Sequence, residues 1–332
     1  MIHKFLFDNE PLELDLSKQI NNSSSKLNSL IRAIVVKIFR KSYKFFQQSF
    51  LRPSIRQKLS FLEKLIFRKD HKINNFHNLG TVKKNVTELK SSSFVKIDNI
   101  FSDNEILKIR TQFSSNNIKL DPIYGKYEKF RITDKVINAH TGYIPTEKIF
   151  NNTNIIKGAL NQNLLNTLKL HFNSSFKLDW IWSWWSIPNE KSLGPQLFHR
   201  DYESMNFVKF FVYLTDVNEN NGPHQIISGS HNENNFYKRE RFKDYDINKK
   251  YKKKINTIYG NAGTNFLADT FAIHRGQLPR INKRLVLVYL FSVVPSNRCP
   301  KLPFMNVNKI TDKKISKEMK KNQSIFDQIY SF

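Results

Sequence analysis

The segment NFVKFFVYL, residues 206–214, has the aromatic and β-branched composition of a buried β-strand. Three more apolar segments of strand length lie in the same half of the chain, and Gly- and Asn-rich turns separate them: LDWIWSWWSI at 178–187, GTNFLADTFAI at 263–273 and RLVLVYLFSVV at 284–294. Several short strands that follow a helical region predict a β-sandwich or jelly roll with helices packed outside it. The chain is therefore expected to be mainly β with flanking helices.

The region before these strands is expected to be more helical. Phe94, Val95 and Ile97 predict one early strand, and Asp103 is expected to cap the helix that follows it. Residues 150–172 again have a helical pattern. The polar stretch from Asn74 to Ser93 predicts a linker, and the sequence contains no internal repeats.

The first ninety residues differ in residue pattern from the rest of the chain. Apolar residues recur at helical spacing between Ile31 and Phe46, Pro53 interrupts the pattern, and a second helical stretch follows with Leu59, Leu62 and Ile66. Between Arg32 and Asp70 there are 11 basic residues and two acidic ones. Such a segment either packs on the neighbouring domain or lies on an anionic membrane, and residues 30–70 leave peripheral membrane contact open.

The whole chain is strongly basic, with 54 Lys and Arg against 28 Asp and Glu and a net charge of +26. This balance is compatible with anionic substrates, lipid headgroups or nucleic acid, although the charges are spread along the chain and no nucleic-acid-binding motif is present. Cys299 is the only cysteine, which excludes a disulfide framework and a Cys-rich zinc site. With no signal-peptide pattern and no membrane-span pattern, the sequence predicts a cytoplasmic protein.

A metal-ligand pattern lies in LGPQLFHRDYES, residues 193–204. His199 and Asp201 are two residues apart, so an extended chain points both side chains to one face. His274 closes the predicted strand at 263–273. Two imidazoles and one carboxylate on one face of an iron leave positions open for a co-substrate and oxygen, so these three residues predict a 2-His-1-carboxylate site.

The sequence contains a competing H-x-[DE] pair. His231 and Glu233 have the same spacing as His199 and Asp201, and His224 lies nearby. However, His231 opens a long polar run with no strand pattern, which predicts a solvated loop. His199 and His274 instead precede apolar strands, and this context favours them as the metal ligands.

A cation at the start of the last strand suits a dicarboxylate co-substrate. Arg284 follows His274 by ten residues, where its planar guanidinium is placed to pair with the distal carboxylate of 2-oxoglutarate. Arg280 and Lys283 are alternatives that spacing alone does not exclude.

From about Ser92 to Val294 the sequence resembles the phytanoyl-CoA dioxygenase family of Fe(II)/2-oxoglutarate oxygenases. The matching segments are the opening SSFVKIDNIFSDNEILKI, the first metal motif QLFHRD, the strand and turn YLTDVNENNGPHQIISGSH, and ADTFAIHRG with the following Arg284. Ser228 stands where the family usually has proline. The WIWSWWSIP strand, where some relatives have a second 2-oxoglutarate contact, offers no residue that we can match.

The resemblance implies a double-stranded β-helix, that is, a cupin-like jelly roll. It implies Fe(II) held by His199, Asp201 and His274, with 2-oxoglutarate at Arg284 and a structural role for His231. Oxygen would be the second co-substrate, with succinate and CO₂ as products. Since related halogenases lack the carboxylate ligand, Asp201 favours hydroxylation of an aliphatic C–H bond.

These observations predict three regions: a basic, helical extension at 1–90, the oxygenase domain at 91–297 and a C-terminal tail at 298–332. The substrate is expected to be a small metabolite, anionic or carrier-linked. Four residues near the metal motif are candidate substrate contacts, each with packing or local hydrogen bonding as the alternative: Trp184, Trp185, Gln196 and Asn206. The rival functions are a nucleic-acid-associated oxygenase and a non-catalytic, ligand-binding jelly roll.

Overall fold

The computed structural model describes residues 52–68, 79–98, 100–123, 128–135, 137–296 and 305–332. A seven-stranded antiparallel sheet forms its centre, in the order β1-β8-β5-β10-β4-β3-β2. The strands are β1 (Phe94–Ile97), β2 (Asp121–Ile123), β3 (Thr141–Tyr143), β4 (Lys177–Ser186), β5 (Phe207–Tyr213), β8 (Asn265–Ala268) and β10 (Arg284–Ser292). The four apolar segments predicted as strands therefore all contribute to this sheet.

A smaller antiparallel sheet faces it, in the order β7-β6-β9. Its strands are β6 (His224–Ile227), β7 (Ile255–Ile258) and β9 (His274–Gly276). Apolar side chains from both sheets meet between them in a cluster that we call the inner cluster: Phe211, Tyr213, Val217, Ile226, Ile258, Phe266, Ala268, Ala272, Val286 and Val288. Two antiparallel sheets closed over a shared core form the predicted jelly roll.

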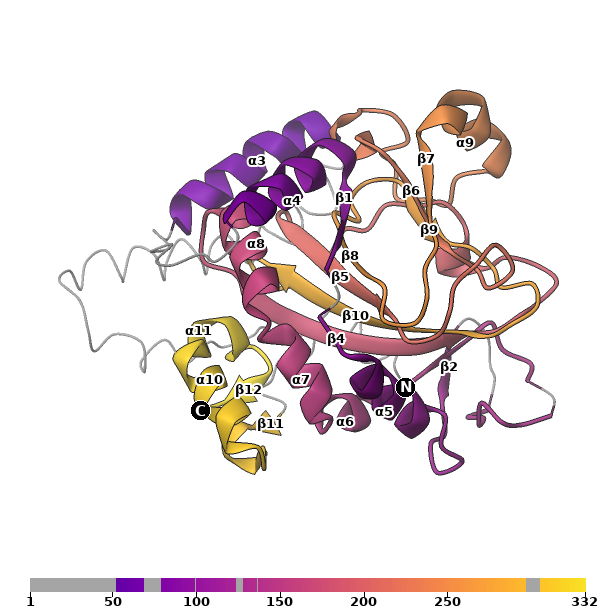
Figure 1. Cartoon of the computed structure of the whole chain (residues 1–332). Helices are drawn as coiled ribbons and strands as arrows, with labels where there is room; N and C mark the ends of the chain where they lie inside the picture. The colour runs from indigo at the N-terminus through magenta and orange to yellow at the C-terminus, as the bar shows by residue number, and fades with distance from the viewer. Residues whose placement is uncertain (1–51, 69–78, 99, 124–127, 136, 297–304) are drawn as a thin grey trace.

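Helices cover the other face of the large sheet (Figure 1). They are α4 (Leu79–Ser92), α5 (Asp103–Phe113), α6 (Thr146–Phe150), α7 (Thr153–Ala159), α8 (Gln162–Phe172), α10 (Lys313–Lys321) and α11 (Gln323–Phe326). β10 is buried along its whole length because the helices lie on one side of it and the inner cluster on the other. This double burial explains why its sequence is apolar without alternation.

Two further helices lie outside this layer. α3 (Pro53–Ile66) lies next to the 3₁₀ turn Ser230–Asn232, and α9 (Asp244–Tyr251) lies beside the small sheet (Figure 1). A short parallel pair, β11 (Met305–Asn306) with β12 (Tyr330–Ser331), ends the fold. In the described part of the chain, no helix is long and apolar enough to cross a membrane.

Two local predictions need correction. Residues predicted as a linker contain α4, because Val82, Val86 and Leu89 recur at helical spacing and are buried. The N-cap of α5 is Ser102 rather than Asp103: the Ser102 side chain accepts from the Glu105 amide, and Glu105 reaches back in a capping box. Ser and Asp both favour N-cap positions, so the sequence by itself does not distinguish Ser102 from Asp103.

The second N-terminal helical stretch is confirmed as α3, which begins at Pro53 as its pattern predicts. The first stretch, Ile31 to Phe46, lies outside the described residues. The C-terminal residues Met319, Phe326 and Tyr330 are buried in the main core together with the strands of the large sheet. The division into 1–90, 91–297 and 298–332 stays a prediction.

Candidate active site

Three side chains with ligand atoms for a metal meet beside the inner cluster. Nε2 of His199 lies 3.5 Å from Oδ1 of Asp201, and Nε2 of His274 lies 3.2 Å from Oδ2 of the same carboxylate. One ligand atom from each residue lies within 4.8 Å of the others, and both histidines are buried. The three predicted ligands therefore converge in the geometry that a 2-His-1-carboxylate metal site requires.

The backbone fixes this convergence. His199 and His274 form a bridge between neighbouring extended segments, with N–H···O distances of 3.0 and 2.9 Å in the two directions. The Asp201 amide donates to the Thr270 carbonyl at 2.9 Å. Backbone hydrogen bonds thus hold two segments about seventy residues apart in sequence side by side. The fold therefore brings the candidate ligands together.

Each imidazole is also oriented. Nδ1 of His199 donates to the Leu197 carbonyl at 2.8 Å, and Nδ1 of His274 donates to the Ala272 carbonyl at 2.9 Å. Because a carbonyl can only accept, each Nδ1 carries the proton and each Nε2 keeps a free electron pair. Burial lowers the pKa of His199 to about 4, so this ring is neutral at pH 7. Both histidines therefore point ligand atoms at the same place as Asp201.

Arg284 is buried at the start of β10, on the strand next to β4. Its Nη2 donates to Ser186 Oγ at 3.1 Å and its Nη1 to the Gly222 carbonyl, while its buried Nε has no hydrogen-bond partner among the described residues. Gly276, two residues after His274, leaves room for the guanidinium, since a Cβ there would lie 2.8 Å from Nη2. The arginine and the metal-ligand strand are thus in direct contact.

The two alternatives to Arg284 have other surroundings. Nζ of Lys283 donates to the Ile132 carbonyl at 2.7 Å, and Arg280 is exposed. Of the three cations, Arg284 has the burial and the position that a carboxylate contact beside His274 requires. A buried guanidinium with one donor unpaired is costly unless a ligand accepts from it, so the residues present fit a carboxylate ligand.

The family model described as phytanoyl-CoA dioxygenase matches residues 135–277, which include all three of these metal-ligand candidates. This stretch is therefore similar to the phytanoyl-CoA dioxygenase family. The resemblance seen in the sequence is thereby confirmed over these residues, which include the group that could hold a metal ion. No curated protein matches the chain significantly.

Three solved structures are similar to this chain at low sequence identity. The epimerase SnoN from nogalamycin biosynthesis is 11% identical over 64% of this chain and 83% of its own, with a TM-score of 0.45. The carbocyclase SnoK from the same biosynthesis is 15% identical over 63% and 83%, with a TM-score of 0.47. HygX from Streptomyces hygroscopicus, with nickel, 2-oxoglutarate and hygromycin B bound, is 15% identical over 63% and 86%, with a TM-score of 0.43.

A buried lysine that the sequence motifs did not indicate lies beside the metal group. Nζ of Lys209 lies 2.7 Å from Oδ2 of Asp201 and 2.8 Å from Oε1 of Glu203. Burial by itself would lower the pKa of Lys209, but the two carboxylates raise it well above its usual value. Strand alternation in the sequence could have indicated this position, because on β5 Lys209 lies on the same face as Phe211 and Tyr213, which belong to the inner cluster.

A second missed residue is His224 on β6. Its ring stacks on His274, with centroids 5.4 Å apart and an interplanar angle of 18°, and its buried Nε2 has no hydrogen-bond partner among the described residues. Burial lowers its pKa well below the usual value. In the sequence this residue was noted only as a neighbour of the competing pair. His231 of that pair contacts Ser93 instead, with Nδ1 2.6 Å from Oγ.

The two candidate tryptophans lie on opposite faces of β4. Trp184 packs against the inner cluster and stacks on Tyr143, with ring centroids 5.4 Å apart. Trp185 is in the main core, and its Nε1 donates to the Phe113 carbonyl at 3.4 Å. Of these two, only Trp184 lies on the face of the sheet that carries the inner cluster. Strand alternation predicts that Trp180 shares this face, but it packs edge-on against Phe150, beside the register shift after Leu290.

The two polar candidates are also buried. Oε1 of Gln196 accepts from the Leu193 amide at 2.9 Å and lies 3.3 Å from Nδ1 of His140, whereas its Nε2 has no partner in the described structure. Asn206 instead faces α3, where its side chain contacts Ser60 and Glu63. Gln196 therefore has an amide donor without a partner among the described residues, whereas the side chain of Asn206 is hydrogen-bonded to α3.

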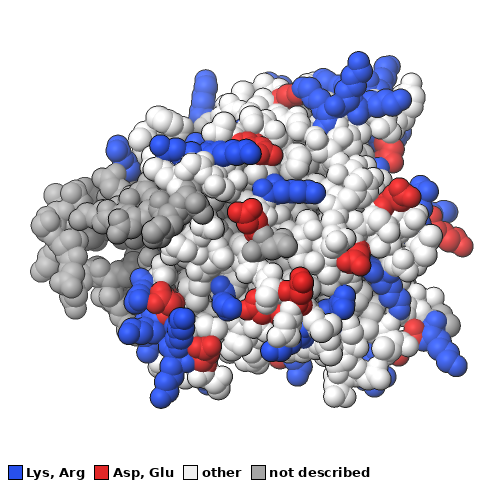
Figure 2. Space-filling view, viewed as in Figure 1, with Lys and Arg blue, Asp and Glu red and all other residues white. Residues whose placement is uncertain are grey.

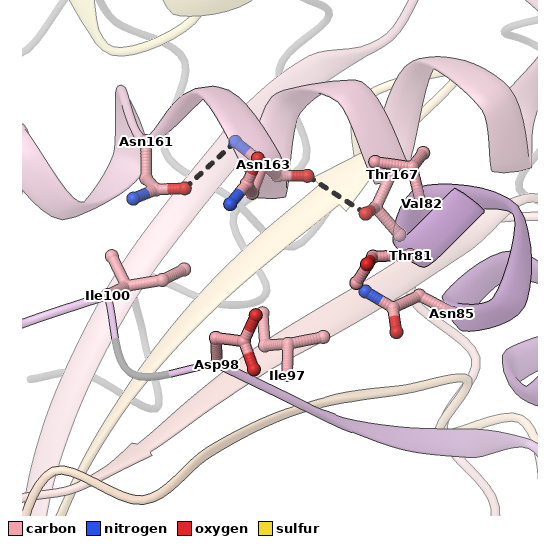
Figure 3. A pocket seen from close by; sticks show the side chains of 9 residues that line it. All are labelled: Thr81, Val82, Asn85, Ile97, Asp98, Ile100, Asn161, Asn163 and Thr167. Carbon is pink, nitrogen blue, oxygen red and sulfur yellow. Dashed lines mark hydrogen bonds between the residues drawn. The ribbon is translucent and has the colours of Figure 1, made fainter. Parts of the chain in front are cut away.

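A separate surface pocket lies between α4, β1 and the start of α8 (Figure 3). Its polar groups serve the helix itself: Oδ1 of Asn161 caps α8 by accepting from the Asn163 and Leu164 amides, and the Thr167 hydroxyl donates to the Asn163 carbonyl. None of the metal-ligand candidates lines this pocket. We therefore place the chemistry at the metal group and not there.

Proposed function

We propose that the protein is an Fe(II)- and 2-oxoglutarate-dependent dioxygenase that hydroxylates an aliphatic C–H bond of a small metabolite, anionic or carrier-linked. The single observation that carries the proposal is the convergence of His199, Asp201 and His274 beside the buried Arg284. Three protein ligands leave three positions on a six-coordinate iron, enough for a bidentate 2-oxo acid and oxygen. The match of residues 135–277 to a dioxygenase family supports it.

The chain's own residues would bind the metal and 2-oxoglutarate and would exclude water. His199 and His274 offer Nε2 atoms, while their Nδ1 atoms donate to backbone carbonyls. Asp201 offers a carboxylate whose pKa burial would raise, but which Lys209 holds well below its usual value. Arg284 would bind the distal carboxylate of 2-oxoglutarate through its guanidinium, with Ser186 Oγ within hydrogen-bond distance of Nη2. Apolar residues of the inner cluster would keep water away from the reacting atoms.

Bound iron, with 2-oxoglutarate and oxygen, supplies the C–H oxidation and yields succinate and CO₂. Asp201 supports hydroxylation over halogenation because it fills the position that a halide would need. Trp184 and the unpaired Nε2 of Gln196 are proposed as substrate contacts, together with the less favourably placed Trp185 and Asn206. Oxygen, 2-oxoglutarate and the small molecule are the expected partners, in the cytoplasm.

The test is anaerobic binding followed by turnover. The protein should bind Fe(II), and adding 2-oxoglutarate should produce the visible charge-transfer band of a chelated 2-oxo acid. A metabolite panel is then screened for coupled succinate release and for a product that has gained one oxygen atom. Asp201→Ala should lose metal binding, and Arg284→Met should bind metal but lose 2-oxoglutarate affinity.

Lys283→Met is the matched control, since it removes a neighbouring cation with a different contact. Wild-type Fe(II) binding by both His199→Ala and Asp201→Ala would contradict the site. A product that has lost hydrogen without gaining oxygen would keep the oxygenase assignment and overturn hydroxylation.

A further inference from the structure

Lys209 is an unusual residue for the inside of an apolar jelly roll. Its side chain is 11% exposed, on a strand that otherwise carries only aromatic and β-branched residues. The ammonium group bridges two carboxylates, Oδ2 of Asp201 and Oε1 of Glu203, and lies 5.8 Å from the ring centroid of Trp182. A buried cation of this kind is stable only with such partners, so Lys209 and the two acids form one electrostatic unit.

This unit affects which carboxylate oxygens a metal can use. Asp201 and Glu203 are two residues apart on one segment, and both would be competent ligands for a divalent cation. Lys209 occupies Oδ2 of Asp201 and the Oε1 of Glu203 at 2.7 and 2.8 Å. Oδ1 of Asp201 lies 3.5 Å from Nε2 of His199 and is not the oxygen that Lys209 contacts, whereas Oδ2 is shared between Lys209 and Nε2 of His274, 3.2 Å away.

We propose that Lys209 is a positioning residue that makes Asp201 bind the metal through Oδ1 alone and keeps Glu203 from becoming a fourth protein ligand. The inference rests on the metal site of the proposed function. Its consequence is a coordination sphere with three protein ligands, because an extra carboxylate oxygen would occupy a position that 2-oxoglutarate or oxygen needs. Lys209 therefore acts on the metal only through the two carboxylates.

The experiment uses the full chain loaded with Co(II), whose d–d absorption reports coordination number, and measures 2-oxoglutarate binding by calorimetry. The variants are Lys209→Met, Glu203→Gln and the charge-balanced double variant that combines them. Lys252→Met, on the surface turn Lys252–Lys254, is the matched control for loss of a positive charge. The result depends on spectra and affinities, and it needs no substrate.

Lys209→Met is expected to keep Co(II) binding, change the d–d spectrum and weaken 2-oxoglutarate binding by about 10-fold or more, as outer-shell substitutions do. The double variant should recover part of this loss, because the amide that Glu203→Gln introduces is a poor ligand compared with a carboxylate. Lys252→Met should match the wild type in both measurements, and Glu203→Gln should keep the wild-type Co(II) spectrum because Asp201 still pairs with Lys209.

Two outcomes would overturn the inference: a Lys209→Met protein with the wild-type spectrum and 2-oxoglutarate affinity, or a double variant as impaired as the single one. If Lys209→Met does not fold, Glu203→Gln decides, since a changed Co(II) spectrum would show that Glu203 already binds the metal. Failure of the wild type to bind either Co(II) or Fe(II) would instead contradict the proposed function.

Discussion

At the scale of single residues, the site depends on what lies directly behind each ligand. The carbonyls of Leu197 and Ala272 fix the histidine tautomers, Lys209 holds the carboxylates, and the missing side chain of Gly276 admits Arg284. None of these contacts contributes a ligand atom. Each nevertheless orients a metal ligand or the guanidinium of Arg284. Substitutions there should therefore change metal or 2-oxoglutarate binding without removing a ligand atom.

Gly276→Ala should weaken 2-oxoglutarate binding while leaving metal affinity unchanged. The added Cβ would lie 2.8 Å from Nη2 of Arg284 and displace the guanidinium, and we expect a loss of about 10-fold or more. Calorimetry on the Co(II)-loaded protein measures both affinities. Gly80→Ala is the control, because no atom lies within 4 Å of a Cβ there. Equal affinity in the two variants would show that Arg284 does not need this space.

Asp179 should make stability depend on pH. Burial raises its pKa to about 7, and its Oδ2 accepts from Ser292 Oγ and the Ser296 amide. Because the folded-state pKa lies above the unfolded value, the protonated carboxyl favours the fold at low pH. That contribution is complete below about pH 4 and is lost as the pH rises through about 7.

Asp179→Asn removes this dependence. At pH 8 the variant should be more stable than the wild type by on the order of 2–4 kcal/mol, and at pH 4 the two should be similar. Urea unfolding at pH 4, 6 and 8 measures the difference. A constant offset between the two proteins across this range would contradict the titration.

At the scale of secondary-structure elements, α3 has an inverted distribution of side chains. Its buried residues include Arg56 and Glu63, whereas Phe61, Leu62 and Leu65 are exposed by 63%, 50% and 49%. The polar face is used for docking: Nη2 of Arg56 donates to the Ser204 carbonyl, and Glu63 accepts from Asn206. These partners lie on the segment that joins Asp201 to β5, so the N-terminal helix supports the metal loop.

Arg56→Met should lower the free energy of unfolding by about 2 kcal/mol, the range for losing a charged hydrogen bond in a buried place. The guanidinium also packs 4.2 Å from the ring centroid of Phe271, near the second metal motif. Chemical denaturation measures the change. Lys58→Met, which removes a charge from the exposed side of the same helix, should change it by less than about 0.5 kcal/mol. Equal effects would mean that α3 does not depend on this contact.

At the scale of the whole molecule, the net charge of +26 is distributed and not confined to one site. In Figure 2, Lys and Arg gather over the α9 region at the upper right, and acidic side chains are interspersed elsewhere on this face. The pattern favours general attraction to anionic surfaces. Membrane contact through residues 30–70 stays a prediction, to which the exposed Phe61, Leu62 and Leu65 on α3 add apolar area.

The full chain should therefore float with vesicles that contain anionic lipid and remain behind with purely zwitterionic ones. A variant with Phe61, Leu62 and Leu65 each changed to Ser should float less, because interfacial binding combines apolar burial with charge attraction. Raising the salt concentration should weaken the membrane binding that this variant retains, because salt screens the attraction between charges. Absence of flotation in low salt would end the membrane hypothesis and leave packing on the domain as the role of this region.

The amino-acid sequence determined the strands, the order of the motifs and the choice of His199, Asp201 and His274 as candidate metal ligands, because periodicity and residue chemistry are local properties. It left Arg284, Arg280 and Lys283 as alternative carboxylate contacts, and the polar composition of α4 led to the wrong prediction of a linker. Only the tertiary structure decided which cation is buried beside His274, that Lys209 bridges two carboxylates, and that α3 turns its polar face inward. Those features depend on segments far apart in the chain, and their meeting is set by the closure of the two sheets.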